Sequence, residues 1–317
     1  MLFPALDRPQ VWPAPPSTPR IKLIGTLRDS GDLRAAVSGK EAFASALRGP
    51  RPPIRFSSPH TIAVNATSLL AVADTGASAV HVIDLERRTH TRVTGFLSEK
   101  FAAPVGVAWA GDRLFVTDAK RGEVVELDAQ GGYVRRFGAA VLRRPVGIAF
   151  ASGRNEVYVV DGDAHTVVRF DLSGRHVATI GRRGSAPGEF NYPSHLCIRG
   201  DKLLVSDSGN FRVQLLDLEG RPIRTIGQKG DGAGDFSLPK GVAFDSEGHI
   251  YVVDAQFENV QVFDSAGQLL MAFGREGTDL GAFWLPSGLT IDDEDRIWVA
   301  DTGNRRVQLF SYLRAPP

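Results

Sequence analysis

Six aspartates in the sequence could do acid–base or metal chemistry, because carboxylates gathered at one place bind hard cations or transfer protons. Each ends a short apolar segment, and they recur at intervals of 43 to 47 residues. They are Asp74, Asp118, Asp161, Asp207, Asp254 and Asp301. A group needed for turn geometry should occur in every repeat, and aspartate often accepts hydrogen bonds from nearby backbone N–H groups. We therefore interpret these carboxylates as structural turn residues, with a calcium site as the alternative.

Two histidines are candidates for metal chemistry, because imidazole nitrogens are common ligands of divalent metals. His60 directly follows a proline, and His195 lies two residues after one, each at the start of an apolar segment. Catalytic zinc usually has three protein ligands and an open position. The corresponding positions of the other repeats hold only Val, Gly, Lys or Ser, so no third histidine joins the pair. We predict no cofactor and keep a divalent metal at His60 and His195 as an alternative.

These residues belong to a unit that recurs six times. An apolar segment introduced by proline, such as PKGVAF from Pro239, precedes most of the aspartates by about fifteen residues. A second segment ends in the aspartate, as in VYVVD at Asp161, a third begins about six residues later, and a fourth follows a glycine-containing turn, as in GRPIRTIG. Val, Ile, Phe and Tyr favour strands, whereas Gly, Asp and Pro favour turns. Four short strands in such a unit are typical of a propeller blade.

The predicted fold class is therefore all-β, a six-bladed β-propeller of four-stranded blades. The sixth unit ends at VQLFSYLR without a fourth strand, whereas IKLIGTLRDSGDL at 21–33 aligns with IRTIGQKGDGAGDF at 223–236. We expect the N-terminal strand to complete the C-terminal blade. This pairing would close the ring and leave no unpaired sheet edge at the junction.

The rest of the chain divides around this ring. Residues 1–20 are rich in proline and predict an extended tether, residues 21–312 form the propeller, and residues 313–317 are a C-terminal tail. Within 33–56, apolar residues recur at three- or four-residue steps behind a capping Asp32, which predicts a short helical insertion. It is either a packing element or a lid over the propeller, because long loops in compact domains often carry function.

Composition excludes several function classes. The 317 residues are 43% hydrophobic and 23% charged, and the formal net charge of +1 gives no global field that would recruit nucleic acid. No apolar run approaches the roughly 18 to 20 residues of a transmembrane helix, so we predict no transmembrane segment. The single cysteine, Cys197, cannot form an intrachain disulfide and fits a small buried apolar residue better than a nucleophile.

Two of the repeats carry a more specific pattern, DSGNFRVQLLD at 207–217 and DTGNRRVQLF at 301–310, in which Arg212 and Arg306 are placed to pair with the aspartates. Together with the P-x-G segments, this pattern resembles the NHL-repeat family over about residues 20–312. The Pro-rich leader, the IKLIGTL strand and the YPSHL segment further resemble bacterial exported, often lipid-anchored, six-bladed NHL propellers. That resemblance implies the bacterial envelope, in the periplasm or anchored at the surface, with the cytoplasm as the alternative.

The topology indicates where a partner would bind. In such blades the loops between second and third strands emerge on the same face as the connections between blades, around the central channel. The candidate binding residues in these loops are basic, amide, histidine and aromatic, as on many protein-recognition surfaces. They are Lys120, Arg121, His165, Asn210, Phe211, Gln256, Phe257, Asn304 and Arg305. We predict a non-enzymatic, monomeric scaffold that binds a protein partner, or else a peptide or saccharide.

Two other function classes stay open. Related six-bladed propellers, the peptidylglycine amidating lyases, hold a histidine-ligated metal near the channel, so the resemblance implies a metal-dependent lyase or hydrolase at His60 and His195 as an alternative. Some NHL propellers bind single-stranded RNA on a basic face, which is the second alternative. Here basic loop residues such as Arg143 and Lys229 alternate with acidic ones such as Asp163 and Asp231, which disfavours nucleic acid.

Overall fold

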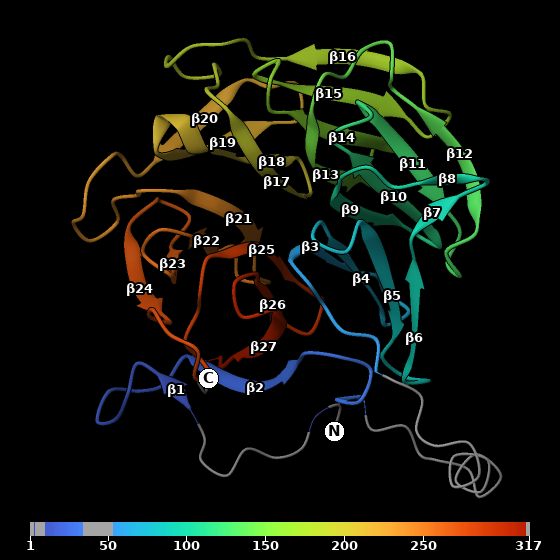
Figure 1. The fold of residues 1–317 in the computed structure, drawn as a ribbon. Coiled ribbons are helices and arrows are strands. Elements are labelled where there is room, and N and C mark those ends of the chain that lie inside the picture. The colour runs from blue at the N-terminus through green and yellow to red at the C-terminus, as the bar shows by residue number, and fades with distance from the viewer. Residues whose placement is uncertain (1–2, 4–9, 34–52, 315–317) are drawn as a thin grey trace, which may run out of the picture.

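The protein is a ring of six β-sheets around a common axis (Figure 1). This computed structural model describes residue 3, residues 10–33 and residues 53–314, and all that follows refers to them. Helical structure in this part of the chain is limited to one 3-10 turn, η1 (Ser208–Asn210). Among the described residues, no helix has the length and apolar character needed to cross a membrane. The predicted six-bladed, all-β fold is confirmed.

Each of the first five blades is a four-stranded antiparallel sheet whose strands follow one another in the chain. Blade 1 contains β3 (Pro59–Val64), β4 (Leu69–Asp74), β5 (Ala79–Asp84) and β6 (Thr89–Val93). Blade 2 contains β9 (Pro104–Ala110), β10 (Arg113–Asp118), β11 (Glu123–Leu127) and β12 (Tyr133–Phe137). Blade 3 contains β13 (Pro145–Ala151), β14 (Glu156–Asp161), β15 (Thr166–Asp171) and β16 (His176–Ile180).

The second half of the ring repeats this order. Blade 4 contains β17 (Pro193–Arg199), β18 (Lys202–Asp207), β19 (Arg212–Asp217) and β20 (Pro222–Ile226). Blade 5 contains β21 (Pro239–Phe244), β22 (Ile250–Asp254), β23 (Asn259–Phe263) and β24 (Leu269–Phe273). Blade 6 contains β25 (Pro286–Ile291), β26 (Arg296–Asp301), β27 (Arg306–Tyr312), β2 (Ile21–Leu27) and β1 (Val11–Trp12).

The hydrophobic core lies between neighbouring blades. The second strand of each blade is buried on both faces, as in β22, whose five residues are all buried, because a blade packs against each side. Tyr158 of blade 3 packs with Leu203 of blade 4, and Phe115 of blade 2 packs with Phe170 of blade 3. Burying such a side chain contributes about 1.5–3 kcal/mol. The fold is thus held by six similar interfaces.

The inner strands of the six blades touch one another around the axis, and β25 contacts β3 to complete the circle. The glycine of the P-x-G segment permits this approach. A Cβ atom at Gly147 would lie 2.8 Å from the carbonyl oxygen of Ser194, and one at Gly288 would lie 2.4 Å from that of His60. Backbone of one inner strand therefore occupies the space that a side chain of its neighbour would need.

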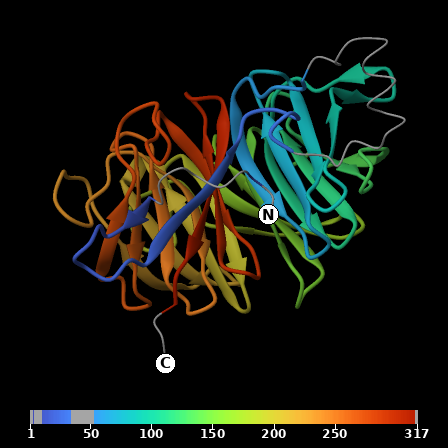
Figure 2. The same ribbon diagram turned by 90° about the horizontal axis from the view of Figure 1, so that it is seen from below.

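The ring closes as predicted, because β2 pairs antiparallel with β27, with Lys22 opposite Ser311. Figure 2 shows this blue strand beside the red C-terminal blade. Strand β1, which lies within the expected tether 1–20, adds a fifth strand to blade 6 by pairing with β2. Its Trp12 ring lies 6.0 Å from Phe273 and 5.7 Å from Phe310. Part of the Pro-rich leader is thus docked on blades 5 and 6.

Two features lie outside the repeat. A short hairpin, β7 (Gly95–Phe96) and β8 (Glu99–Lys100), precedes blade 2, and Phe96 stacks on Tyr133 at 5.2 Å. The insertion expected at 33–56 is described only at its ends, where Leu33 and Phe56 are buried in one apolar cluster with strands of blades 1 and 6. Its predicted helix falls on residues 34–52, which lie outside the described residues.

Candidate functional site

The six strand-end aspartates are fully buried and accept hydrogen bonds from the backbone. Asp118, for example, accepts from the N–H groups of Ala102 at 2.7 Å, Ala103 at 3.0 Å and Arg121 at 3.2 Å. The first two residues precede the inner strand of the blade, and the third lies in the loop between second and third strands. These contacts fit a structural role, since each carboxylate joins two loops on one face of its blade.

The face that carries these aspartates also carries the second-to-third loops and the connections between blades, and we call it the loop face. In blades 1, 2, 3 and 5, two consecutive N–H groups before the inner strand bind the aspartate. Blades 4 and 6 depart from this arrangement. Only Asn191 donates such a bond to Asp207, at 2.6 Å, and only Trp284 donates one to Asp301, at 2.8 Å.

Side chains of the D-x-G-N-x-R-V-Q pattern replace the missing backbone donor. In blade 4 the amide of Asn210 and the guanidinium of Arg212 each donate to Asp207 at 2.8 Å, and Gln214 donates at 3.1 Å. In blade 6, Asp301 accepts the equivalent bonds from the side chains of Asn304, Arg306 and Gln308. The expected pairing of Arg212 and Arg306 with the aspartates is confirmed at 2.8 Å and 2.7 Å.

In blades 4 and 6, the second N–H group before the inner strand donates instead to a side chain of the preceding blade. Tyr192 N–H donates to Nδ1 of His165 at 3.0 Å, and Leu285 N–H donates to Oε1 of Glu258 at 3.1 Å. Both donors adopt left-handed backbone, with φ of 46° and 48°, which is costly for bulky residues. Tyr192 and Leu285 are 49% and 50% exposed, and Trp284 is 51% exposed. Two of the six blades therefore present large apolar residues that are about half exposed, whereas the residue before the inner-strand proline is Ser58, Ala103, Arg144 or the less exposed Leu238 in the others.

The histidines predicted near the axis meet there. The rings of His60, on β3, and His195, on β17, stack with centroids 5.5 Å apart and planes inclined by 12°. Because blades 1 and 4 oppose each other in the ring, the two side chains span it. Burial first, then the charge of Lys240, lowers the pKa of His60 to about 3. Burial also lowers the pKa of His195 well below its usual value, so both rings are neutral at pH 7.

A chain of hydrogen bonds fixes the tautomer of His195. Ser208 Oγ donates its hydrogen to the carbonyl of Pro239 at 2.6 Å, so it accepts from Ser194 Oγ at 2.7 Å. Ser194 Oγ therefore accepts from Nδ1 of His195 at 3.1 Å, which leaves Nε2 with a lone pair. Nε2 of His195, Nδ1 of His60 and Oγ of Ser287 are buried without a hydrogen-bond partner among the described residues. A cavity of about 40 Å³ adjoins His195.

These two imidazoles are a sparse donor set for a metal. The described residues contain no group of three or more His, Cys, Asp or Glu side chains that could hold an ion. The charge of Lys240, which lowers the pKa of both rings, acts against a bound cation in the same way. A metal at His60 and His195 would thus need ligands from outside these residues.

Lys240 is the second residue of β21, at the loop-face end of this inner strand, and is partly exposed. Burial, and then the charge of Arg144, lower its pKa, and no carboxylate contributes. The residues at the second position of the six inner strands are His60, Val105, Val146, Ser194, Lys240 and Ser287. Blades 4, 5, 6 and 1 therefore carry a polar residue there, and blades 2 and 3 an apolar one.

The nine candidates from the second-to-third loops fall into four groups. Lys120, Gln256 and Arg305 are exposed, whereas Phe211 and Phe257 are half-buried, with Lys229 5.1 Å above the Phe211 ring. Asn210 and Asn304 bind the aspartates, and Arg121 forms an ion pair with Glu99. His165 is buried beneath Tyr192, with ring centroids 4.6 Å apart. The sequence reasoning missed Tyr192, Trp284 and Leu285, although the two D-x-G-N segments marked their blades.

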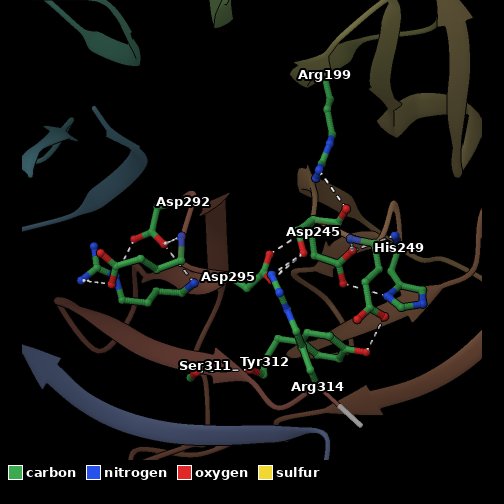
Figure 3. A network of polar contacts seen from close by, with 12 residues as sticks. Arg199, Asp245, His249, Asp292, Asp295, Ser311, Tyr312 and Arg314 are labelled. Carbon is green, nitrogen blue, oxygen red and sulfur yellow. Dashed lines mark hydrogen bonds and ion pairs between the residues drawn. The ribbon is translucent and has the colours of Figure 1, made fainter. Parts of the chain in front are cut away.

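The opposite face shows a different polar cluster (Figure 3). Buried Asp245 accepts from His249 Nδ1 at 2.8 Å and from Tyr251 at 3.1 Å. Arg314 donates to Asp295 at 2.7 Å, and Tyr312 donates to Glu247 at 3.0 Å. The Tyr312 bond joins the end of the described chain to blade 5, and the Arg314 bond holds it to blade 6. Nearby Cys197 is partly buried, and burial raises its pKa to about 11, which opposes thiolate chemistry.

Comparison with known proteins agrees with this architecture. The NHL repeat matches residues 283–310, which include most of blade 6. The protein called brain tumor of Drosophila melanogaster is 27% identical over 132 residues, which cover 40% of this chain and 13% of that protein.

Solved structures with this fold have varied functions. A streptogramin B lyase has a TM-score of 0.61 at 11% identity, over 81% of this chain and 94% of its own. An auxiliary nutrient binding protein of Bacteroides thetaiotaomicron has a TM-score of 0.63 at 16% identity, over 82% and 70%. At such identities the likeness shows the fold alone. The repeat at 283–310, the six blades and the ring closure through β2 together show a six-bladed β-propeller that carries an NHL repeat in its last blade.

Proposed function

We propose that this propeller is a non-enzymatic binding scaffold that recognises a protein partner on the loop face of blades 4 to 6. The observation that carries the proposal is the half-exposed set of Tyr192, Trp284 and Leu285. Soluble proteins expose single apolar side chains everywhere, but aromatic residues gathered among polar neighbours are typical of interface centres.

The backbone geometry supports the same reading. Tyr192 and Leu285 adopt left-handed backbone that costs about 1–3 kcal/mol each, and it is held by bonds to His165 and Glu258 in the preceding blades. The corresponding connections of the four other blades do not adopt it and instead give a regular pair of N–H bonds to their aspartates. Ten other non-glycine residues of the described chain also have positive φ, so the support lies in the position of these two, which stand in connections on the loop face and are about half exposed.

Rigid presentation would also favour binding. The two loops end in prolines 193 and 286, and the two N–H groups before each proline are bonded within the ring, as are the carbonyl groups of Asn191 and Trp284. A side chain that is already fixed loses little conformational entropy when a partner covers it. The half-buried Phe211 and Phe257 and the exposed Arg305 lie in neighbouring loops and would border such a contact.

The alternatives have weaker support in the described residues. A metal-dependent reaction would rest on His60 and His195 alone. Single-stranded RNA binding would need free cations, yet Arg144 pairs with Asp163 at 2.6 Å and Arg182 with Glu189 at 2.8 Å. Solved propellers of this shape include both a lyase and a nutrient binding protein, so the fold itself does not choose between these classes.

Affinity capture from the native organism tests the proposal. The bait is the intact protein beside the double variant Tyr192→Asn, Leu285→Asn, because asparagine tolerates left-handed backbone and removes the apolar surface. The control variant is Ile223→Asn, which removes a side chain of similar exposure, 54%, on the outer strand β20. We expect a partner, identified by mass spectrometry, that the control retains and the double variant loses. Partners captured equally by all three baits would contradict recognition through this face.

A further inference from the structure

Lys240 occupies the middle of the proposed surface. Blade 5 lies between blade 4, which carries Tyr192, and blade 6, which carries Trp284 and Leu285 (Figure 1). Lys240 follows Pro239 at the loop-face end of β21, just as Ser194 follows Pro193 and Ser287 follows Pro286 in the flanking blades. A segment laid across blade 5 from one apolar group to the other would therefore pass over this lysine.

The charge of Lys240 is not compensated by the described protein. The charge that shifts the pKa of Lys240 is that of a cation, Arg144, and the lysine in turn lowers the pKa of both channel histidines. Arg144 itself pairs with Asp163. A half-buried ammonium group without a counter-charge is unfavourable, because it loses hydration and gains no ion pair in return.

The surroundings of Lys240 fit one small anionic group. The neighbouring inner strand carries Ser287, whose Oγ is buried and has no partner among the described residues. A carboxylate can accept from an ammonium group and a hydroxyl at once. A doubly charged phosphate would fit less well, because Lys240 supplies a single positive charge.

We propose, on the basis of the binding function above, that Lys240 pairs with the side-chain carboxylate of an aspartate or glutamate in the partner segment that lies between Tyr192 and Leu285. The apolar groups would anchor the segment, and the ion pair would fix its register. The partner class is thus an acidic peptide segment with apolar residues on both sides of the acid. Charge complementarity gives specificity more than affinity, which suits a single lysine at the centre of an apolar contact.

A random peptide library displayed on phage, selected on the immobilised intact protein, supplies the probe. We expect the selected peptides to share an Asp or Glu flanked by apolar residues. One such peptide and its Asp→Asn or Glu→Gln analogue are then titrated against wild type, Lys240→Met and Lys240→Arg. Loss of either charge should weaken binding roughly tenfold, loss of both should weaken it no further, and Lys240→Arg should restore most of the affinity.

The outcomes separate this inference from the proposed function. If the Tyr192→Asn, Leu285→Asn variant loses the peptide while Lys240→Met binds it as wild type does, the lysine assignment is overturned and the binding face stands. If neither change affects binding, both are wrong. Peptides that depend on a free C-terminal carboxylate, as shown by loss of binding on amidation, would also overturn the side-chain assignment. Thermal unfolding of Lys240→Met, expected at or above the wild-type temperature, confirms that a loss of binding is not a loss of fold.

Discussion

At the scale of single residues, the histidines on the ring axis couple stability to pH. His60 has its pKa lowered to about 3, so the folded protein keeps it neutral where the unfolded chain protonates it. The unfolded state then binds more protons between about pH 6.5 and pH 3, and stability falls as the pH decreases through that range. His195, whose pKa is also lowered by burial, acts in the same direction, and the charge of Lys240 helps to lower the pKa of both rings.

The variant His60→Gln should therefore lose less stability on acidification. Between pH 7 and pH 5, a buried neutral histidine makes the free energy of unfolding fall by about 1–2 kcal/mol, and glutamine has no such dependence. Urea unfolding at both pH values measures the difference. The control is His176→Gln on the outer strand β16, an exposed residue whose removal should keep the wild-type pH slope. Equal slopes for His60→Gln and wild type would contradict the burial of a neutral ring.

At the scale of the blade, a glycine in the aspartate loop lies directly against the shifted connections. In blades 4 and 6 the chain passes so close to the aspartate loop that a Cβ atom at Gly209 would lie 2.6 Å from the carbonyl oxygen of Asn191. A Cβ atom at Gly303 would lie 2.7 Å from both the carbonyl oxygen and the ring of Trp284. The glycine of the D-x-G-N pattern thus makes room for the shifted connection. Gly76 makes a similar approach to the regular connection of blade 1, so glycine is needed for the close packing but does not by itself shift the connection.

Replacing this glycine should disturb its blade. We expect Gly303→Ala to destabilise the protein by about 1–3 kcal/mol, as overpacking against backbone does, and to shift the fluorescence of Trp284. Gly153→Ala is the matched control, because a Cβ atom there meets nothing within 4 Å and its φ is not left-handed. The control should be neutral or slightly stabilising. The midpoints of guanidinium unfolding of the two variants measure the difference. Similar midpoints would contradict the prediction and show that the connection can accommodate a Cβ atom at residue 303.

The comparison between blades also shows what the sequence could predict. The period of the aspartates, the P-x-G segments and the IKLIGTL strand predicted the six blades and their closure, because those signals are local and repeated. The exposure of Tyr192 and Leu285 could not be predicted this way. It depends on bonds from His165 and Glu258, which lie 27 residues earlier in another blade. In the sequence, Lys240 was noted only because its position lacks a histidine. Its lack of a counter-charge could not be predicted, because it depends on the side chains that the assembled ring brings around it.

At the scale of the whole molecule, closure makes each blade depend on all the others. An open array of repeats is stabilised by nearest-neighbour interfaces, so its ends can open alone. Here β2 joins the start of the chain to the last blade, and its Leu23 is buried in the apolar cluster between blades 5 and 6. The bonds of Tyr312 and Arg314 to blade 5 secure the end of the described chain at the same junction.

Weakening this junction should therefore be felt on the far side of the ring. Leu23→Ala removes a buried side chain and should cost about 2–4 kcal/mol. If the ring unfolds as one unit, amide hydrogen exchange should accelerate by the same free energy in β26 of blade 6 and in β14 of blade 3. Val177→Ala, on the exposed face of β16, should change neither. Faster exchange in β26 with unchanged protection in β14 would mean that blade 6 opens alone. The loop face of blades 4 to 6 would then be held by contacts between those blades and not by closure of the ring.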